Sequence, residues 1–268
     1  MIRTTFALAL AGLAALPAAA QDAFDVPVTA RVLSGWVRAD GTRMAGVHLD
    51  LAPGWKTYWR APGDAGIPPQ FDWSGSDNLQ AVAISWPQPI IFEDNGMRSI
   101  GYKNSLVIPV AVTPMYAGAP VHVQLTMDIG VCSDICVPHR LEFDEVLDDV
   151  QTRPTPAIAA ALAQGPYSAR EAGVTSAQCR VEPTADGLRI EARVSVPPAG
   201  GTEVMVIETG LDEVWVSEPK THRSGGDLVA VSEMIHINGG PIALNRSAIR
   251  LTVLGSQHAV DVRGCKAG

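Results

Sequence analysis

Residues 121–129 have the sequence VHVQLTMDI, in which apolar and polar side chains alternate at every position. A period of two is the pattern of a β-strand with one buried face and one face in water. The same alternation occurs at 47–51, 188–196 and 249–253, and turns rich in proline and glycine, such as 52–54, separate these runs. The sequence therefore predicts an all-β protein.

The chain divides into two parts around residue 148, where the composition changes. An alanine-rich stretch, 157–164, follows a proline-rich segment and predicts a short helix. Alternation then resumes up to the end of the chain. Strands at this spacing, with turns between them, are typical of β-sandwiches. We therefore expect two sandwich domains in series, over 21–148 and 177–268, joined by a helix-containing linker at 149–176.

The first twenty residues have the features of a secretory signal. Arg3 supplies a positive charge, 6–16 is an apolar run, and Ala18-Ala19-Ala20 is a cleavage site of small residues. An apolar run of roughly 11 residues is too short to cross about 30 Å of hydrocarbon. We expect cleavage near Ala20, which leaves an exported, soluble, periplasmic protein that does not insert into the membrane.

The charge of the chain excludes several function classes. The formal net charge is -8, and removal of Arg3 with the signal leaves 19 Lys+Arg against 28 Asp+Glu, or -9. An acidic protein of this kind is not expected to bind nucleic acid or anionic membrane surfaces. The sequence also has no phosphate-binding loop, no Gly-x-Ser-x-Gly elbow and no His-Glu-x-x-His motif. We therefore predict no cofactor and no bound metal as the default.

Two of the four cysteines flank the second domain. Cys179 lies at its start and Cys265 near its end. An even number of cysteines in an exported protein indicates disulfides. Paired, these two would close a long loop and stabilise the domain by about 4 kcal/mol. We expect this disulfide to be structural.

The other two cysteines, Cys132 and Cys136, are separated by three residues. A disulfide between them closes a very small loop and removes little chain entropy, so redox chemistry is a better reason for it than stability. A short structural bridge and a metal site remain alternatives. Copper(I) would accept the thiolates with Met97 or Met127, whereas zinc would find only His139 nearby. His139, if protonated, would also favour a thiolate.

About 100 residues of the first half resemble a known family. The motifs are LAPGWKTYWR at 51–60, PGDAGIPP at 62–69, Trp86-Pro87, IGY at 100–102 and VCSDICVP at 131–138. Together they resemble the N-terminal periplasmic domain of the DsbD and ScsB thiol–disulfide interchange proteins. The resemblance implies an immunoglobulin-like sandwich, and it extends less well to the second domain.

The resemblance also implies roles for particular residues. In the family, the two loop cysteines shuttle between dithiol and disulfide, which assigns this role to Cys132 and Cys136. A cap loop with an acidic residue close to the thiols shields the pair, and here it corresponds to 92–101 with Glu93 or Asp94 as the acid. Tyr58 corresponds to an aromatic position near the pair.

Two features depart from the best-known DsbD domains. Those domains have more residues between the cysteines, so the spacing here is nearer the ScsB type. Their cap loop also carries an aromatic residue after the acids, where this sequence has Asn95-Gly96-Met97.

The resemblance further implies partners. Because the sequence shows no membrane segment after the signal and no thioredoxin-like domain, we expect a separate membrane-embedded thiol reductase as electron donor. A thioredoxin-like periplasmic protein is the expected acceptor, and the second domain is expected to be dispensable for exchange. Two other classes stay open: a binding module for copper or a partner protein, in which the short disulfide fixes a loop, and a purely structural adaptor. The sequence does not decide which cysteine attacks or the direction of electron flow.

Overall fold

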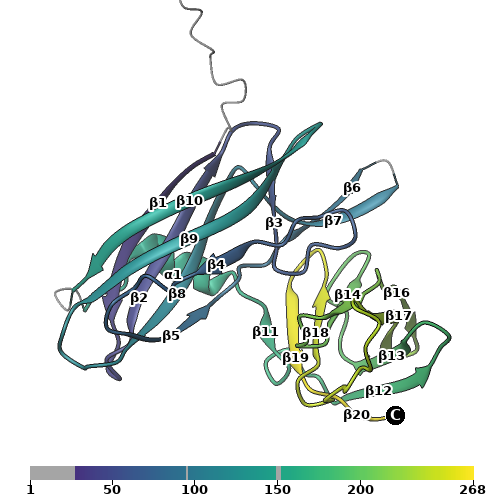
Figure 1. The fold of residues 1–268 in the computed structure, drawn as a ribbon. Coiled ribbons are helices and arrows are strands. Elements are labelled where there is room, and N and C mark those ends of the chain that lie inside the picture. The colour runs from purple at the N-terminus through teal and green to yellow at the C-terminus, as the bar shows by residue number, and fades with distance from the viewer. Residues whose placement is uncertain (1–27, 95, 149–151) are drawn as a thin grey trace, which may run out of the picture.

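The structure is a computed structural model that describes residues 28–94, 96–148 and 152–268. It confirms the predicted fold class: two immunoglobulin-like β-sandwiches in series, joined by a linker that contains one short helix (Figure 1). The predicted secretory signal lies outside the described residues. The exact domain boundaries stay a prediction.

The N-terminal sandwich consists of two antiparallel sheets. In the first, the strand order is β1 (Val28–Val37), β2 (Arg43–Leu51), β8 (Ser105–Pro114), β5 (Leu79–Ile84). In the second, it is β10 (Cys136–Leu147), β9 (Val121–Cys132), β3 (Lys56–Tyr58), β7 (Met97–Lys103), β6 (Ile90–Asp94), and β4 (Gln70–Asp72) pairs with β9.

The alternation in β9 determines which side chains enter the core. Its odd-numbered residues from Val121 to Val131 are buried in the core between the two sheets. The even-numbered residues point to the outer face of the sheet, because successive side chains of a strand lie on opposite faces. Cys132 continues this outer series, so the fold itself directs Cys132 away from the core.

The linker helix α1 (Pro156–Ala163) packs against the outer face of the first sheet. Ile158 is fully buried there, and a Cβ atom at Gly46 of β2 would lie 3.0 Å from its Cγ1 atom. The hydroxyl of Thr155, the residue before the helix, donates to the Ser34 carbonyl oxygen in β1 at 2.9 Å. The helix therefore covers a sheet face that would otherwise be in water. In the described part of the chain, no helix is long and apolar enough to cross a membrane.

The C-terminal sandwich has the same two-sheet plan. One sheet has the order β11 (Tyr167–Ser168), β19 (Ala259–Arg263), β18 (Arg250–Leu254), β14 (Val204–Glu208). The other has the order β15 (Val214–Val216), β17 (Asp227–His236), β13 (Leu188–Ser195), β12 (Ser176–Pro183), β20 (Lys266–Ala267), with β16 (Lys220–Ser224) paired to β17. A disulfide joins Cys179 in β12 to Cys265, just before β20, across a Cα–Cα distance of 5.7 Å.

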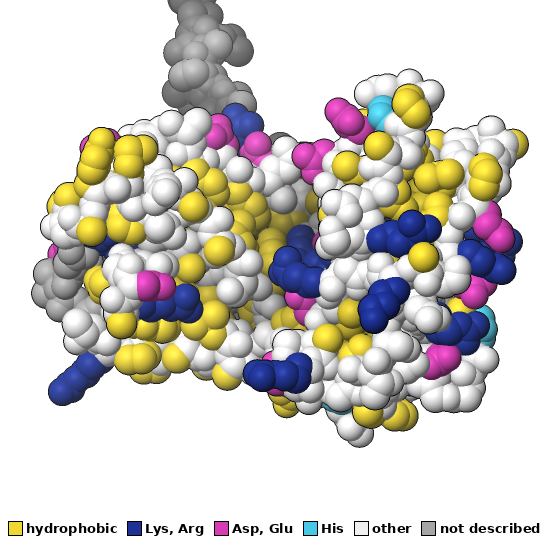
Figure 2. Space-filling model, turned by 90° about the horizontal axis from the view of Figure 1, so that it is seen from below, with side chains coloured by type: hydrophobic (Ala, Val, Ile, Leu, Met, Phe, Trp, Pro, Cys, Tyr) yellow, Lys and Arg dark blue, Asp and Glu magenta, His cyan; other side chains and the backbone are white. Residues whose placement is uncertain are grey.

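The two sandwiches pack against each other, and strand β14 contributes side chains to the cores of both. Its side chains Met205 and Ile207 enter the C-terminal core, whereas Val204 and Val206 pack with the core cluster of the N-terminal sandwich. The strand is thus buried on both faces. Figure 2 shows the depression between the two lobes, in which apolar side chains are gathered.

The packing of α1 leads to a stability prediction. We expect Ile158→Ala to lower the free energy of unfolding by about 2–5 kcal/mol, because it leaves a cavity between the helix and β2. Denaturant unfolding of the whole chain measures this. Ile237→Ala is the matched control, since Ile237 is 63% exposed and its truncation should cost less than about 0.5 kcal/mol. Equal losses in both variants would show that α1 does not pack as described.

Candidate functional site

The two closely spaced cysteines lie at the tip of the β9–β10 hairpin. The strands pair over twelve residue pairs, the last of which joins Cys132 to Cys136. The two are bonded in a disulfide with a Cα–Cα distance of 4.1 Å. Residues directly opposite in an antiparallel pair project from the same face, so both sulfur atoms lie on the outer face of the sheet.

Tyr58 covers the disulfide from the neighbouring strand β3. Its hydroxyl donates towards Cys132 Sγ at 3.0 Å and Cys136 Sγ at 3.4 Å, and it lies 3.4 Å from the Ala65 carbonyl oxygen. The side chain is only 3% exposed. The structure therefore places Tyr58 near the pair, where the resemblance implied an aromatic residue. Its hydroxyl can donate a hydrogen bond to either sulfur.

Two glycines make room for the Tyr58 ring. A Cβ atom at Gly66 would lie 2.9 Å from the ring atom Cδ1, and one at Gly130 would lie 3.1 Å from Cδ2. A Cβ atom at Gly130 would also lie 2.8 Å from Cβ of Ile67. Side chains at these two positions would crowd the tyrosine ring and the residues around it, Pro62 and Ile67, so both glycines favour its place over the sulfurs.

Two lysines that were given no role from the sequence lie beside the pair. Lys56 is directly opposite Cys132 in the β3–β9 ladder and opposite Lys103 in the β3–β7 ladder. Both lysines line the same cleft as the two cysteines. A nearby positive charge favours a thiolate over a thiol. The signal for Lys56 was available, because it is two residues before Tyr58 and a strand places such residues on one face.

The hairpin formed by β6 and β7 closes one side of this cleft; we call it the cap hairpin (residues 90–103). Phe92, Met97 and Ser99 line the cleft. The Lys56 ammonium group lies 4.8 Å from the centre of the Phe92 ring and donates to Ser99 Oγ at 3.2 Å. Phe92, which precedes the acids, is thus an aromatic residue of the cap hairpin that lines the cleft.

The structure does not bring all the predicted modulators to the sulfurs. Glu93 is not among the residues that line the cleft; its carboxylate binds Arg98 at 2.7 Å on the other face of the cap hairpin. Asp94 lies in β6 opposite Met97, but its side chain lies outside the described part of the structure. His139 is paired with Ile129 in the ladder and lies three residues from Cys136, so its side chain is on the opposite face. The suggestion that His139 favours a thiolate is therefore corrected.

The structure also distinguishes between the two methionines that were considered as copper(I) ligands. Met127 is 1% exposed and lies in the core, on the face opposite the sulfurs, so it is excluded as a copper ligand. Met97 is 59% exposed and lines the cysteine cleft. Among the described residues, no three His, Cys, Asp or Glu side chains are grouped so as to hold a metal ion.

The two cysteines differ sharply in exposure. Cys132 is fully buried beneath Tyr58, whereas Cys136 is exposed at the edge of the cleft. The turn between them, 133–135, is exposed as well, and the Ser133 amide donates to the Ile135 carbonyl oxygen at 3.0 Å. The Cys136 side of the disulfide is therefore open to solvent, whereas the Cys132 side is closed.

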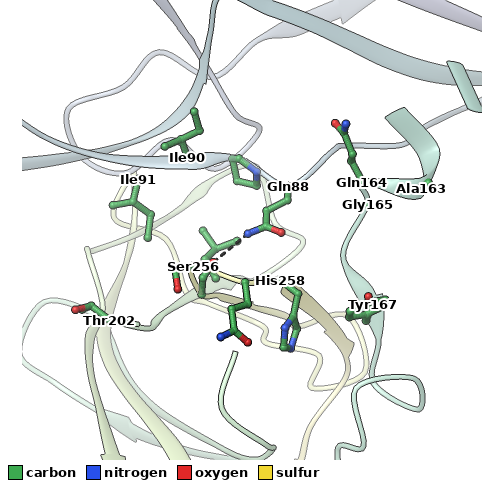
Figure 3. Close-up of a pocket in the computed structure, with 14 residues that line it drawn as sticks. Gln88, Ile90, Ile91, Ala163, Gln164, Gly165, Tyr167, Thr202, Ser256 and His258 are labelled. Carbon is green, nitrogen blue, oxygen red and sulfur yellow. Dashed lines mark hydrogen bonds between the residues drawn. The ribbon is translucent and has the colours of Figure 1, made fainter. Parts of the chain in front are cut away.

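A second cleft lies between the two sandwiches (Figure 3). Gln88 from the N-terminal sandwich donates there to the Gly255 carbonyl oxygen at 3.0 Å, and His258 packs against Tyr167 with ring centres 5.4 Å apart. The lining residues of this cleft include no thiol, carboxylate or ammonium group. It therefore offers no chemistry comparable with that of the cysteine cleft.

A β-sandwich that presents a cysteine pair at a hairpin tip, beneath a tyrosine and beside a cap hairpin, is a thiol–disulfide interchange module. Comparison with known families agrees with this class. Residues 23–148 match the family model described as thiol:disulfide interchange protein DsbD, N-terminal. This match covers the N-terminal sandwich and supports a DsbD-type N-terminal domain in this part of the chain.

Solved structures extend the likeness to both sandwiches. The chain is similar to the N-terminal periplasmic domain of ScsB from Proteus mirabilis, with a TM-score of 0.67 and 18% identity over 94% of this chain and 97% of that chain. It is also similar to the N-terminal domain of DsbD from Neisseria meningitidis in the reduced form, with a TM-score of 0.28 and 21% identity over 44% of this chain and 85% of that chain. The first likeness shows that the tandem fold is shared. None of the curated protein sequences compared with the chain matches it.

The hydroxyl of Tyr58 leads to the second prediction. On reduction, it can donate a hydrogen bond to a thiolate, and bonds to charged groups contribute about 1.5–3 kcal/mol. We expect Tyr58→Phe to slow alkylation of the reduced pair at neutral pH about tenfold. Tyr116→Phe is the control, because Tyr116 is 67% exposed and absent from the cleft lining. Alkylation at the wild-type rate in Tyr58→Phe would mean that the hydroxyl does not stabilise the thiolate.

Proposed function

We propose that the protein relays electrons between other proteins through the Cys132–Cys136 pair, with Cys136 as the cysteine that exchanges with the partner. The observation that carries this proposal is the unequal exposure of the two sulfurs. Thiol–disulfide exchange needs the attacking sulfur to approach the disulfide in line, and the Cys132 side is closed by Tyr58. Cys132 then acts as the resolving cysteine.

The electron balance of the proposed exchange is as follows. In the reduced protein, the Cys136 thiolate attacks a partner disulfide, forms a mixed disulfide and releases one partner thiolate. Cys132 then attacks the Cys136 sulfur, which forms the Cys132–Cys136 disulfide and releases the second partner thiolate. The partner gains two electrons. Reduction of the Cys132–Cys136 disulfide by a donor dithiol reverses the same steps.

The surroundings of the pair suit this chemistry. Lys56 and Lys103 line the cleft that contains both sulfurs, so two positively charged side chains border the cleft in which negative charge forms in each step. The Tyr58 hydroxyl can donate to whichever sulfur is the thiolate, because it already lies within 3.4 Å of both. These groups lower the energy of the thiolate forms through which exchange proceeds.

The proposed partners follow from the family. We propose a membrane-embedded thiol reductase as donor and a thioredoxin-like protein as acceptor. The similar ScsB domain is described as periplasmic, and the sequence predicts a secretory signal, so we propose that the exchange takes place in the periplasm. One dithiol carries two electrons once, and a separate donor must then restore it.

A second candidate function is copper(I) binding by the reduced pair. The observation that favours it is Met97, whose thioether lines the cleft that contains both cysteines. Thiolate and thioether sulfurs are soft ligands that select copper(I). In this candidate, the short disulfide would be the metal-free form of a binding module.

The relay is tested by trapping its intermediate. In Cys132→Ser, Cys136 remains exposed but no thiol remains to resolve the mixed disulfide. We expect this variant to accumulate a covalent complex with an oxidised thioredoxin-like periplasmic protein, seen on a non-reducing gel and lost with reductant. Cys136→Ser should trap little, because Cys132 is buried. The Cys179→Ser, Cys265→Ser double variant controls for thiols of the C-terminal sandwich.

Two outcomes contradict the proposal. Trapping by Cys136→Ser alone would reverse the roles of the two cysteines. If neither single-cysteine variant captures a donor or an acceptor in cells, the relay is rejected, and copper titration of the reduced protein then decides the second candidate.

A further inference from the structure

The two faces of the cap hairpin contact different parts of the molecule. On one face, Phe92, Met97 and Ser99 line the cysteine cleft. On the other, Glu93 and Arg98 are paired with each other across the two strands. Figure 1 shows the hairpin extending from the N-terminal sandwich above the C-terminal one. A contact made by the face that carries Glu93 and Arg98 therefore also sets the position of the face that lines the cysteine cleft.

Arg98 makes such a contact with the C-terminal sandwich. Its Nη1 atom lies 2.7 Å from Oε1 of Glu218, in the connection between β15 and β16. The Arg98 and Glu218 side chains are only 23% and 34% exposed, so the ion pair is partly shielded from solvent and salt. Glu93 binds the Nε atom of the same guanidinium at 2.7 Å. Arg98 is thus held between the hairpin and the second domain.

A second contact anchors the segment that carries Tyr58. Arg60, two residues further along, donates from Nε and Nη2 to the two carboxylate oxygens of Glu208, each at 3.0 Å, and to Thr252 Oγ1 at 3.1 Å. Its guanidinium also stacks on Trp59 at 3.9 Å. Burial lowers the pKa of Arg60, and the charge of Glu208 opposes this effect. Bidentate pairing of this kind fixes geometry as well as charge.

The loop that follows Arg60 is bonded to the cap hairpin and so connects the Arg60–Glu208 contact with the Arg98–Glu218 contact. The Ile100 amide, in the cap hairpin, donates to the Pro62 carbonyl oxygen at 2.9 Å, and a Cβ atom at Gly63 would lie 3.1 Å from the Arg98 carbonyl oxygen. The same loop contains Gly66, against which the Tyr58 ring packs. The cap hairpin, the loop and Tyr58 therefore form one packed unit that rests on the C-terminal sandwich.

We propose that the C-terminal sandwich positions the redox site: Glu218 holds Arg98, and with it the cap hairpin, in the place where Phe92 and Met97 close the cysteine cleft. Glu218 and Arg98 are positioning residues, since neither touches the sulfurs. Loss of the contact frees the hairpin to move away, which opens the cleft further and exposes the buried Cys132 side of the pair as well. This inference rests on the proposed function and replaces the expectation that the second domain is dispensable for exchange.

The test measures how fast the full-length oxidised protein is reduced at Cys132–Cys136 by dithiothreitol. Mass spectrometry of quenched, alkylated samples follows this disulfide separately from Cys179–Cys265. We expect Glu218→Gln to raise the rate about three- to fivefold, the effect of removing one partly exposed ion pair that favours the closed hairpin. Glu213→Gln is the matched control; Glu213 precedes β15, is 71% exposed and lies 3.8 Å from His236.

A charge exchange separates positioning from loss of folding. In a Glu93→Gln background, which removes the second carboxylate that binds Arg98, Arg98→Glu should raise the rate as Glu218→Gln does, and Arg98→Glu combined with Glu218→Arg should restore the rate of that background. Restoration supports the proposal, because a misfolded protein would not recover. Wild-type rates in both single variants, with both disulfides and the thermal midpoint unchanged, would overturn it. Dithiothreitol needs no protein partner, so this failure is distinguishable from a failure of the relay.

Discussion

The register of β9 against β10 is the constraint on which the redox site depends. Twelve consecutive pairs bring Cys132 opposite Cys136 at the tip of the hairpin, on the outer face of the sheet. A slip by one residue would turn both the core residues of β9 and Cys132 to the wrong face. The buried side chains of β9 therefore fix the position of the disulfide, although they lie on the opposite face of the sheet. Folding of the core and assembly of the redox pair are one event.

The neighbouring strand β3 converts this symmetric pair into an asymmetric one. Tyr58 covers Cys132 and leaves Cys136 at the surface, and Gly66 and Gly130 leave room for its ring. Lys56 lies on the same face of β3, directly opposite Cys132, and its ammonium group donates to Ser99 of the cap hairpin. Exchange depends on which sulfur the partner can approach, so this difference in exposure favours attack at Cys136. The backbone of three adjacent strands supplies this difference.

Much of the fold was predictable from the sequence, because apolar and polar residues alternate along most of the strands. The strands, the helix after the proline-rich segment and the tandem arrangement followed from alternation and turn residues. The cysteine pair and Tyr58 followed from spacing and from family motifs. Lys103 was not predictable as a residue of the cysteine cleft, because its place depends on how β7 pairs with β3. His139 was misplaced because distance along the chain was considered without the alternation of β10.

The contacts between the sandwiches were the least predictable feature. Arg60 and Glu208, or Arg98 and Glu218, are more than a hundred residues apart, and charged residues occur throughout both domains. The one sequence feature that fits these contacts is the continuous apolar run of β14. Such a run suits a strand that is buried on both faces, and here one face packs against the N-terminal sandwich. An arrangement in which the second domain holds the cap explains why a chain with one redox pair carries two sandwiches.

The central claim is that Cys132–Cys136 is a working redox couple, and its reduction potential tests this most directly. The potential is obtained by equilibrating the full-length protein with defined dithiol buffers and counting free thiols at each disulfide. The account predicts a value between about -300 and -120 mV, within the range of exchanging couples, while Cys179–Cys265 stays oxidised throughout. A value for Cys132–Cys136 well below about -300 mV, as for a structural disulfide, would contradict it.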